Sequence, residues 1–494
     1  MGRRNGRGKA FLLDGDLTAF RQPPDMPQWS IVRGSASQPE YDWITLDTSA
    51  HRFLGPISEA FGGGTPALEL WVDRGVTAES FSRTGCGGLI TARVSFHGRR
   101  AAVVWSDFRV NAASFTHANS RRFSAFLNHL AAEQGASLPL IYVVSSAGVS
   151  PMEGRALFTD AFGGWPALLA YAERQPVMTC AVGKCLGLAP LLFGLGHYRV
   201  AVAHQTQINL TGPEVLRLFF GGSVDFAAGA AAERAHDRCD LVHEIVPSVA
   251  AAIERFQELL VPHSSLASDG PPIEGDVGRM LRSFLDAEPR ELVPGWCRSV
   301  RVFLGLRRGA PIGVFVNPPG RPENLITVRT LEKYAAGLDL FRALGVPIVS
   351  LLDSPGIDPR FEQGDANNLR KILWVGDKII RYPHGAMGVV TGRCYGGAAT
   401  LAFPRVFGSR RTVAFRGCRI GMMHERIIAR VLEQSPRLLE QWRQVEAQQG
   451  PAMADLLADG TLDAVIDPWE LGDELDAFLE RLAPPRLMRE DQAR

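Results

Sequence analysis

The sequence predicts an α/β protein in which one type of domain occurs twice in tandem. Continuous apolar runs over residues 138–144 and 346–352 are typical of parallel strands that are covered on both faces. Helical patterns of apolar residues alternate with such runs, as they do in α/β domains. The same order of strand, helix and small-residue turns occurs in both halves of the 494-residue chain, which is long enough for two or more domains.

Composition excludes several classes of partner. Lys and Arg number 53 and Asp and Glu 52, so the charge balance gives no reason to expect nucleic acid or an anionic membrane as a partner. The longest uncharged apolar stretch, residues 185–196, is much shorter than the roughly 20 residues of a membrane span. Seven cysteines without a Cys-x-x-Cys pair favour free thiols in a reducing compartment and no zinc ribbon. We therefore expect a cytoplasmic protein that binds no metal.

Residues 1–85 give the weakest pattern. Pro23, Pro24 and Pro27 interrupt any regular element, and residues 62–64 form a run of glycine. We expect an extended N-terminal arm with a few short helices.

The first domain is expected over residues 86–262. Two β-rich segments, 89–94 and 101–105, flank a Gly-Arg-Arg turn and predict a hairpin. A helix follows, since apolar residues recur there at helical spacing; these are Phe123, Phe126, Leu127 and Leu130. Further strands are predicted at residues 138–144, 177–182 and 198–203.

The second domain is expected over residues 276–484, between a linker at 263–275 that is rich in Pro, Ser and Gly and a tail at 485–494. Its predicted strands repeat the earlier pattern at residues 311–316, 346–352 and 387–390.

The spacing of two turns supports an internal duplication. Cys185 follows Ser146 by 39 positions, and Cys394 follows Ser354 by 40. A solenoid is excluded, because the repeating unit is far longer than a solenoid repeat.

The stretch Val-Thr-Gly-Arg-Cys-Tyr-Gly-Gly-Ala-Ala at residues 390–399 predicts a buried strand that turns sharply into a helix. The first N–H groups of such a helix have no partner, and with the helix dipole they stabilise an oxygen that becomes negative. Residues 183–189 form the counterpart in the first domain. Tight packing alone also explains a glycine pair after a strand. The residues by themselves therefore fit two interpretations, an oxyanion site and a purely structural turn.

Other reactive residue types are interpreted as structural. Cys185 and Cys394 are expected in the core, since nothing near them in sequence would lower the thiol pKa. His117, His129 and His424 are expected as surface or capping groups. A serine hydrolase is disfavoured because Ser145 and Ser146 lack a Gly-x-Ser-x-Gly elbow.

The ordered motifs resemble the carboxyltransferase (β-type) subunit of biotin-dependent acyl-CoA carboxylases, as a divergent member. Residues 146–154 are similar to that family's Ser-Gly-Gly-Ala-Arg-x-x-Glu-Gly loop, and residues 183–189 to its Gly-Pro-Cys-Ala-Gly-Gly-Ala turn. In the second domain, residues 353–356 resemble its Asp-x-Pro-Gly turn and residues 395–398 its Tyr-Gly-Gly-Ala. The resemblance runs from about residue 87 to 482.

The resemblance implies two tandem crotonase-like domains (the β-β-α superhelix of the ClpP/crotonase fold). It also implies carboxyl transfer from carboxybiotin to the α-carbon of an acyl-CoA or acyl-carrier-protein thioester, through enolates held in two backbone oxyanion holes. No side-chain base is required if released biotin takes the α-proton. On the acyl side, the implied catalytic residues are Gly187 and Leu188, and the implied substrate-binding residues are Ala147, Gly148 and Thr400. On the biotin side, the implied catalytic residues are Gly396, Gly397 and Ala398, and the implied biotin-binding residues are Tyr395, Gly397 and Ala398.

The same resemblance implies partners. The chain contains no biotinyl Met-Lys-Met site and no ATP-grasp region, so biotin would be carried by a separate biotin carboxyl carrier or biotin carboxylase subunit. The family assembles face to face, which implies a dimer or a trimer of dimers, or a hetero-oligomer with a paralogue.

Three departures from the family pattern leave two alternatives open. Leu188 stands at the family's second glycine, where its side chain is expected to project toward the thioester. Ser150 replaces an arginine, and His424 begins a His-Glu-Arg segment where family members have glycine and small residues. The alternatives are a biotin-independent decarboxylase of a malonyl-type thioester and a non-catalytic carboxyltransferase-like subunit.

Overall fold

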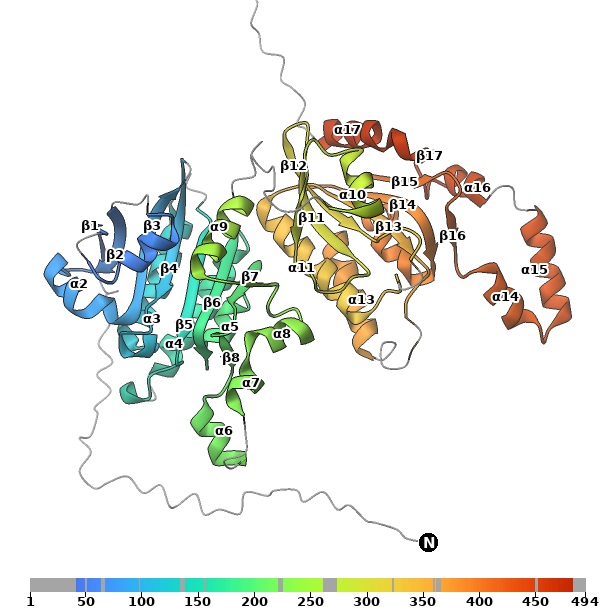
Figure 1. Ribbon diagram of the computed structural model, residues 1–494. Coiled ribbons are helices and arrows are strands. Elements are labelled where there is room, and N and C mark those ends of the chain that lie inside the picture. Colours follow the sequence, from blue (N-terminus) through green and yellow to red (C-terminus); the bar gives the residue numbers. More distant parts are fainter. Residues whose placement is uncertain are drawn as a thin grey trace, which may run out of the picture. The chain divides into compact units, whose positions relative to one another are not determined.

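The computed structural model in Figure 1 has α/β architecture, with helices packed around two sheets. The residues that it describes are 41–48, 51–63, 67–96, 98–133, 138–154, 157–220, 225–260, 273–321, 324–358, 360, 366–448 and 452–482. Most of the expected linker and the whole tail therefore lie outside the described residues. Below, the first half means residues 41–260 and the second half residues 273–482.

The first half is built on a nine-stranded sheet with the order β1-β2-β3-β4-β5-β6-β7-β9, in which β8 also pairs with β6. Pairing is antiparallel from β1 to β4 and parallel beyond β4. The predicted hairpin and parallel strands are all present. The strands are β1 Tyr41–Asp47, β2 Ala67–Asp73, β3 Leu89–Phe96, β4 Arg99–Ser106, β5 Leu140–Ser146, β6 Val177–Leu186, β7 Tyr198–Val202, β8 Gln207–Asn209 and β9 Glu244–Val246.

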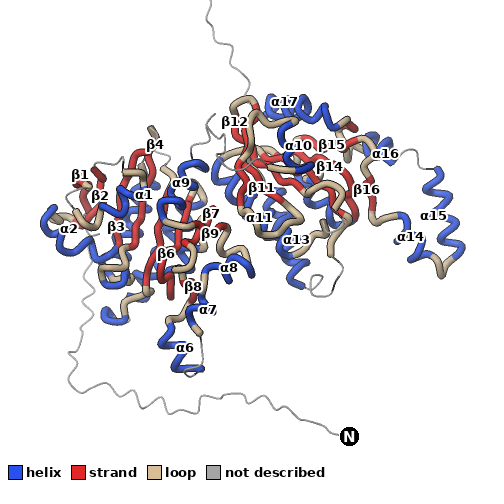
Figure 2. Tube along the Cα trace, viewed as in Figure 1, coloured by secondary structure: helices blue, strands red, loops and turns tan. Residues whose placement is uncertain are grey.

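The second half repeats this plan in an eight-stranded sheet, with the order β10-β11-β12-β13-β14-β15-β17 and with β16 paired to β14. Pairing is antiparallel up to β12 and parallel beyond it. Figure 2 shows the strands of each sheet with helices around them. The strands are β10 Arg290–Leu292, β11 Arg301–Arg307, β12 Ala310–Val316, β13 Ile348–Ser354, β14 Ala386–Tyr395, β15 Arg411–Phe415, β16 Arg419–Gly421 and β17 Ala464–Ile466.

The strand register confirms the duplication that the spacing predicted. In the β5–β6 pair the register shifts after Val144, and Ser146 then pairs with Cys185. In the β13–β14 pair it shifts after Leu352, and Ser354 pairs with Cys394. Each irregularity falls at the strand end that precedes the glycine-rich turn, so both turns leave their sheets at equivalent places.

Corresponding helices begin with the same local device. Helix α3 (His117–Ala132) has Thr116 as its N-cap, and α11 (Val328–Leu344) has Thr327. Each threonine hydroxyl accepts the N–H of the third helical residue, whose side chain bonds back to the N-cap backbone, so a capping box fixes each helix start. The predicted apolar face of α3 is buried against the first sheet.

The remaining helices follow the strands in chain order. They are α1 Gly55–Ala60, α2 Ala78–Thr84, α4 Leu157–Ala172, α5 Ala189–Phe193, α6 Pro213–Phe220, α7 Phe226–Ala230, α8 Ala232–Arg238, α9 Val249–Leu260, α10 Gly275–Arg282, α13 Ala366–Ile380, α14 Glu425–Leu432, α15 Pro436–Gln448, α16 Ala452–Ala458 and α17 Leu471–Leu482. In the part of the chain that the structure describes, none is both long and apolar enough to span a bilayer.

The segment expected as an arm differs from that prediction over its described part. Strand β2 pairs with β3, and β1 pairs with β2, so residues 41–73 extend the first sheet by two strands. Leu68, Leu70 and Val72 explain this, because they bury one face of β2, while Trp71 on the other face is buried as well. The prolines that suggested an arm lie before residue 41, outside the described residues.

Candidate functional site

The turn after β14 requires glycine at two successive positions. It starts the 3₁₀ helix η5 (Gly396–Ala402), and Gly396 has a φ of 54°. A β-carbon added to Gly396 would lie 3.0 Å from the carbonyl oxygen of Met422. One added to Gly397 would lie 2.3 Å from Cδ1 of Ile357, closer than real side chains approach. The backbone of this turn is thus wedged between two neighbouring segments.

This turn offers one N–H group to a ligand. The first i→i+3 bond of a 3₁₀ helix is made by its third residue, so the helix uses the N–H of Ala398 but not those of Gly396 and Gly397. The Gly396 N–H follows the Tyr395–Gly421 pair of β14 and β16, as the Gly187 N–H follows the Leu186–Asn209 pair of the first half, so the Gly397 N–H is the candidate donor. The sequence-predicted residues are therefore together here, and Thr400 lies further along the same 3₁₀ helix.

The corresponding turn in the first half has the same strand pairing before it. Gly187 has a φ of 66° and lies between β6 and helix α5, whose N-cap is Leu188. The N–H of Gly187 donates to the carbonyl of Asn209 at 3.1 Å, whereas that of Leu188 has no partner among the described residues. The Leu188 side chain is buried in the core of the first half, so the expectation that it projects toward a thioester is wrong.

A second loop lies against this turn. Gly148 has a φ of 102°, and a β-carbon on Gly187 would lie 3.1 Å from the Gly148 α-carbon. The Gly148 N–H donates to Ser146 Oγ at 3.0 Å, as the Gly356 N–H donates to Ser354 Oγ at 3.3 Å in the second half. The loop that contains Ala147 and Gly148 thus reaches the acyl-side turn, and the duplication extends to its hydrogen bonds.

An ion pair supports the turn in the second half, and the turn in the first half has no equivalent of it. Oδ1 of Asp353 accepts the backbone N–H and Nε–H of Arg393, each at 2.8 Å, and its Oδ2 accepts the Gly320 N–H at 2.6 Å. Burial raises the pKa of Asp353, but the hydrogen bonds from Arg393 and Gly320 outweigh it and hold the pKa below its ordinary value. Ser145 and Lys184 stand at the equivalent positions of the first half, so only the second half has this clamp.

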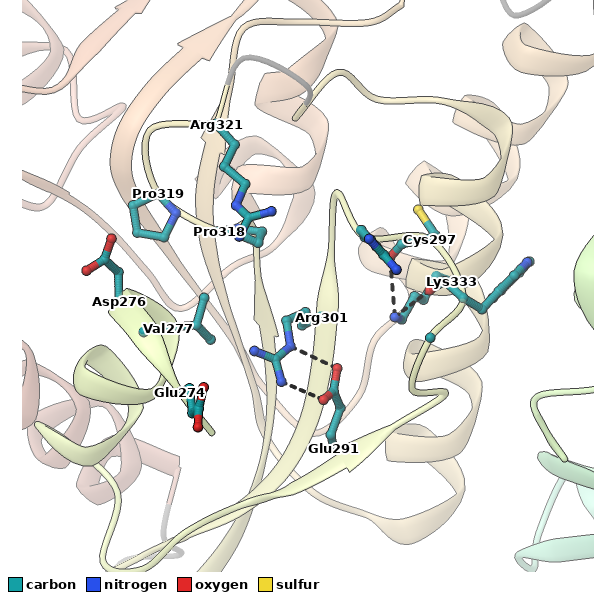
Figure 3. A pocket seen from close by; sticks show the side chains of 14 residues that line it. Glu274, Asp276, Val277, Glu291, Cys297, Arg301, Pro318, Pro319, Arg321 and Lys333 are labelled. Atoms are coloured by element: carbon teal, nitrogen blue, oxygen red, sulfur yellow. Dashed lines mark hydrogen bonds and ion pairs between the residues drawn. The ribbon is translucent and has the colours of Figure 1, made fainter. Parts of the chain in front are cut away.

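A cavity of about 360 Å³ lies near the same edge of the second sheet, where β12 ends and β11 begins (Figure 3). Lys333 lines it, is almost fully buried, and donates from Nζ to the carbonyls of Trp296 and Cys297 at 2.7 and 3.4 Å. Burial lowers the pKa of Lys333 to about 8. Arg321 also lines the cavity, and its carbonyl accepts Nη2 of Arg393 at 2.7 Å, so one cavity wall is tied to the clamp.

Facing Lys333 across this cavity, Arg301 forms a two-pronged ion pair with Glu291 (Figure 3). Nε of Arg301 lies 2.9 Å from Oε1 and its Nη2 2.5 Å from Oε2. No local sequence pattern predicts this cavity, because its walls come from several separate segments of the chain.

The three histidines interpreted as surface or capping groups each have a partner. His424 is the N-cap of α14, and its Nδ1 accepts the Arg426 N–H at 3.2 Å. The His424 ring also meets that of Tyr395 edge-on, with centroids 5.8 Å apart. His117 and His129 pair with the carboxylates of Asp160 at 2.6 Å and Glu133 at 3.0 Å. Sequence reasoning missed that His424 lies beside the Tyr395 turn.

The cysteines near the turns are core residues, as predicted. Cys185 and Cys394 are buried, and burial raises the pKa of Cys394 to about 12 and that of Cys185 further. Neither is therefore a thiolate at neutral pH. Across the described ranges, no group of three or more His, Cys, Asp or Glu side chains is arranged to hold a metal ion.

Comparison with known proteins gives a consistent result. The family profile described as "Carboxyl transferase domain" matches residues 74–472. A biotin-dependent acetyl-/propionyl-coenzyme A carboxylase beta6 subunit of Mycobacterium tuberculosis is 25% identical over 392 residues, which cover 70% of this chain and 80% of the relative. A propionyl-CoA carboxylase beta chain of Saccharopolyspora erythraea is 24% identical over 458 residues, which cover 81% of each chain.

Solved structures have a similar fold. The transcarboxylase 12S structure with hydrolysed methylmalonyl-coenzyme A superposes with a TM-score of 0.68 at 19% identity, covering 82% of this chain and 84% of that one. A single-chain, multi-domain long-chain acyl-CoA carboxylase gives a TM-score of 0.62 at 20% identity, covering 79% of this chain and 41% of that one.

Proposed function

Because the chain belongs to the carboxyl transferase domain family, we propose that it moves a carboxyl group from biotin on a separate subunit to the α-carbon of an acyl-CoA or acyl-carrier-protein thioester. It is a carboxyltransferase, and its two α/β halves have the crotonase-like fold. The observation that carries the proposal is the duplicated glycine-rich turn, in which Gly397 and its counterpart Leu188 supply the candidate N–H donors.

This turn suits the carbonyl end of a ureido group. An N–H donor on a rigid backbone stabilises an oxygen as it gains negative charge, and losing such a donor costs about 2.7–4 kcal/mol in the barrier. Gly396 and Gly397 carry no side chain, so a ligand can approach their backbone closely. Tyr395 is mostly buried and forms the wall beside them. When bound, biotin would supply the carboxyl group to be transferred.

We assign the acyl thioester to the turn in the first half. The Leu188 N–H is available for the thioester carbonyl, and Ala147 and Gly148 form the adjoining loop. The Gly187 N–H donates to the carbonyl of Asn209, and this bond fixes the turn. For the Gly187 N–H to bind a thioester oxygen, the bond to Asn209 would have to break. No His or carboxylate is needed as a base in this scheme, since the α-proton leaves on the ligand that delivers the carboxyl group.

We further propose an oligomer built through two exposed apolar helices at equivalent places in the repeat. Leu218, Phe219 and Phe220 are exposed on α6, as are Ile427 and Val431 on α14. Exposed apolar faces of this kind mark interaction sites. A dimer, a trimer of dimers or a hetero-oligomer with a paralogue would cover them; the transcarboxylase 12S relative is described as a hexamer. The cytoplasm is the compartment that we propose, in line with seven free cysteines.

The test is transfer of labelled carboxylate. The purified full-length chain is mixed with a biotinylated carrier protein charged with ¹⁴C-carboxylate and with a panel of CoA and carrier-protein thioesters. Label is expected in the α-carboxyl group of at least one thioester, and Gly397→Ala is expected to abolish the transfer. Failure with every thioester would remove the proposal.

The two alternatives have distinct outcomes in the same experiment. Loss of carboxylate from a malonyl-type thioester without any carrier would identify a decarboxylase. Transfer that appears only when a paralogous subunit is added, and that is unchanged by Gly397→Ala in this chain, would identify a non-catalytic subunit.

A further inference from the structure

We propose that His424 is a catalytic residue whose Nε2–H donates a hydrogen bond to the same ligand oxygen as the Gly397 N–H group. This inference rests on the proposed function and adds a side-chain donor to a site described so far by backbone alone.

The first argument is position. Strand β16 pairs with the end of β14, with Gly421 opposite Tyr395. The next residue, Met422, places its carbonyl 3.0 Å from where a β-carbon of Gly396 would be. His424 follows two residues later, and its ring meets the Tyr395 ring at an interplanar angle of 63°. The imidazole is therefore held beside the turn by both backbone and ring contacts.

The second argument is the tautomer. Nδ1 of His424 accepts the Arg426 N–H as the N-cap of α14. A neutral imidazole has one donor and one acceptor nitrogen, so the bond at Nδ1 puts the proton on Nε2. Among the described residues Nε2 has no partner, and the side chain is only half-buried. A polar N–H in this position is available to a ligand.

The third argument comes from the duplication itself. Strands β8 and β16 correspond, and each is followed after three residues by an eight-residue helix, α6 or α14. The residue that precedes α6 is Gly212, and the one that precedes α14 is His424. One copy of the turn thus has no side chain where the other has an imidazole. The donor is present only in the half that also has the ion pair of Asp353 with Arg393.

The chemical role is charge stabilisation. A side-chain donor added to the Gly397 N–H shares the negative charge that develops on the oxygen, and the proton stays on Nε2 throughout. Removing one donor of this kind lowers turnover by about 10²–10³-fold in a well-studied oxyanion hole. The KM for the acyl thioester is expected to stay unchanged, because the thioester binds at the other turn.

The decisive variant is His424→Asn, since asparagine is a good N-cap and keeps α14 capped but has no group at the place of Nε2. We expect its turnover to fall by about 100-fold with an unchanged thioester KM and an unchanged melting temperature. In His424→Gly, which restores the residue of the other copy, added imidazole is expected to recover part of the turnover. The control is His204→Gly, a substitution at an exposed histidine of the first half.

The outcomes separate this inference from the proposed function. If the native chain transfers carboxylate and His424→Asn does so equally well, the inference is wrong and the proposed function stands. If the native chain transfers nothing, binding of biotin methyl ester by calorimetry still decides. A Kd at least tenfold weaker in His424→Asn supports the contact, and an equal Kd overturns it.

Discussion

Arg393 donates two hydrogen bonds to a single oxygen of Asp353, one from its backbone N–H and one from Nε. The pair fixes the last residues of β14 directly before the turn at Gly396. Because the first half has Ser145 and Lys184 at these positions, the two turns have unequal support, and this difference can be measured.

Asp353→Asn is expected to destabilise the protein by about 3 kcal/mol, since it removes the buried carboxylate that pairs with the half-buried Arg393 guanidinium. Carboxyl transfer should fall as well, because the turn loses its anchor. Urea denaturation gives the free energy of unfolding. The matched control is Lys184→Ala in the first half, where a change within about 0.5 kcal/mol is expected. A similar loss in both variants would show that the clamp has no special role.

Lys333 predicts a pH dependence in the alkaline range. Its pKa of about 8 in the folded protein lies below the value of about 10.4 for an unfolded chain. Between these values the unfolded chain binds more protons, so stability rises with pH. Burial is the largest cause of the shift, and Cys297, Glu291 and Arg301 are the charged or titratable groups around it.

The measurement is the difference in unfolding free energy between the native chain and Lys333→Met. The contributions of all other titratable groups cancel in this difference. The native chain is expected to gain stability relative to the variant between pH 8 and 10, by about 1–3 kcal/mol. A difference that is flat over this range would mean that Lys333 has an ordinary pKa.

Gly397→Ala tests the close approach of Ile357 to the turn. The added methyl group would overlap Cδ1 of Ile357, so the Ile357 side chain or the turn must shift, and turnover is expected to fall at least 100-fold if the turn is displaced. Adding Ile357→Ala removes the overlap and should restore most of the lost turnover. Gly212→Ala, where the methyl group meets open space, should be neutral. If the double variant is no better than Gly397→Ala, the contact is not the cause.

Leu218→Glu tests whether the apolar face of α6 forms an interface. Leu218 is 87% exposed, so the substitution should leave the fold intact while it lowers the native mass, measured by light scattering. Val406→Glu is the matched control, because Val406 is equally exposed at 87% but lies on neither α6 nor α14. An unchanged mass in Leu218→Glu would place the interface elsewhere.

Much of the fold could be predicted from the sequence, for local reasons. The strands β5 and β13 are buried throughout, so their uninterrupted apolar runs identified them. The 39- and 40-residue steps from Ser146 and Ser354 identified the duplication, because each serine directly pairs with the cysteine at the end of its step. The crotonase-like fold inferred by resemblance is likewise confirmed.

What the sequence could not supply depends on long-range contacts. The Gly187 N–H is occupied because Asn209, on β8, comes to lie next to it, and no local pattern specifies that bond. The burial of Leu188 has the same origin, since it follows from how α5 packs on the sheet. His424 was correctly interpreted as a cap, but its contact with Tyr395 requires the pairing of β14 with β16. The catalytic roles of the turn residues stay predictions.

The serine–glycine bonds repeated in the two halves, from Gly148 to Ser146 and from Gly356 to Ser354, have an evolutionary consequence. Each half maintains the shape of its own loop with its own side chain, so a substitution in one loop leaves the other intact. Two copies with independent scaffolding permit a division of labour. One copy can have a histidine or an ion pair where its sister has a glycine or no such pair, and both stay within one polypeptide.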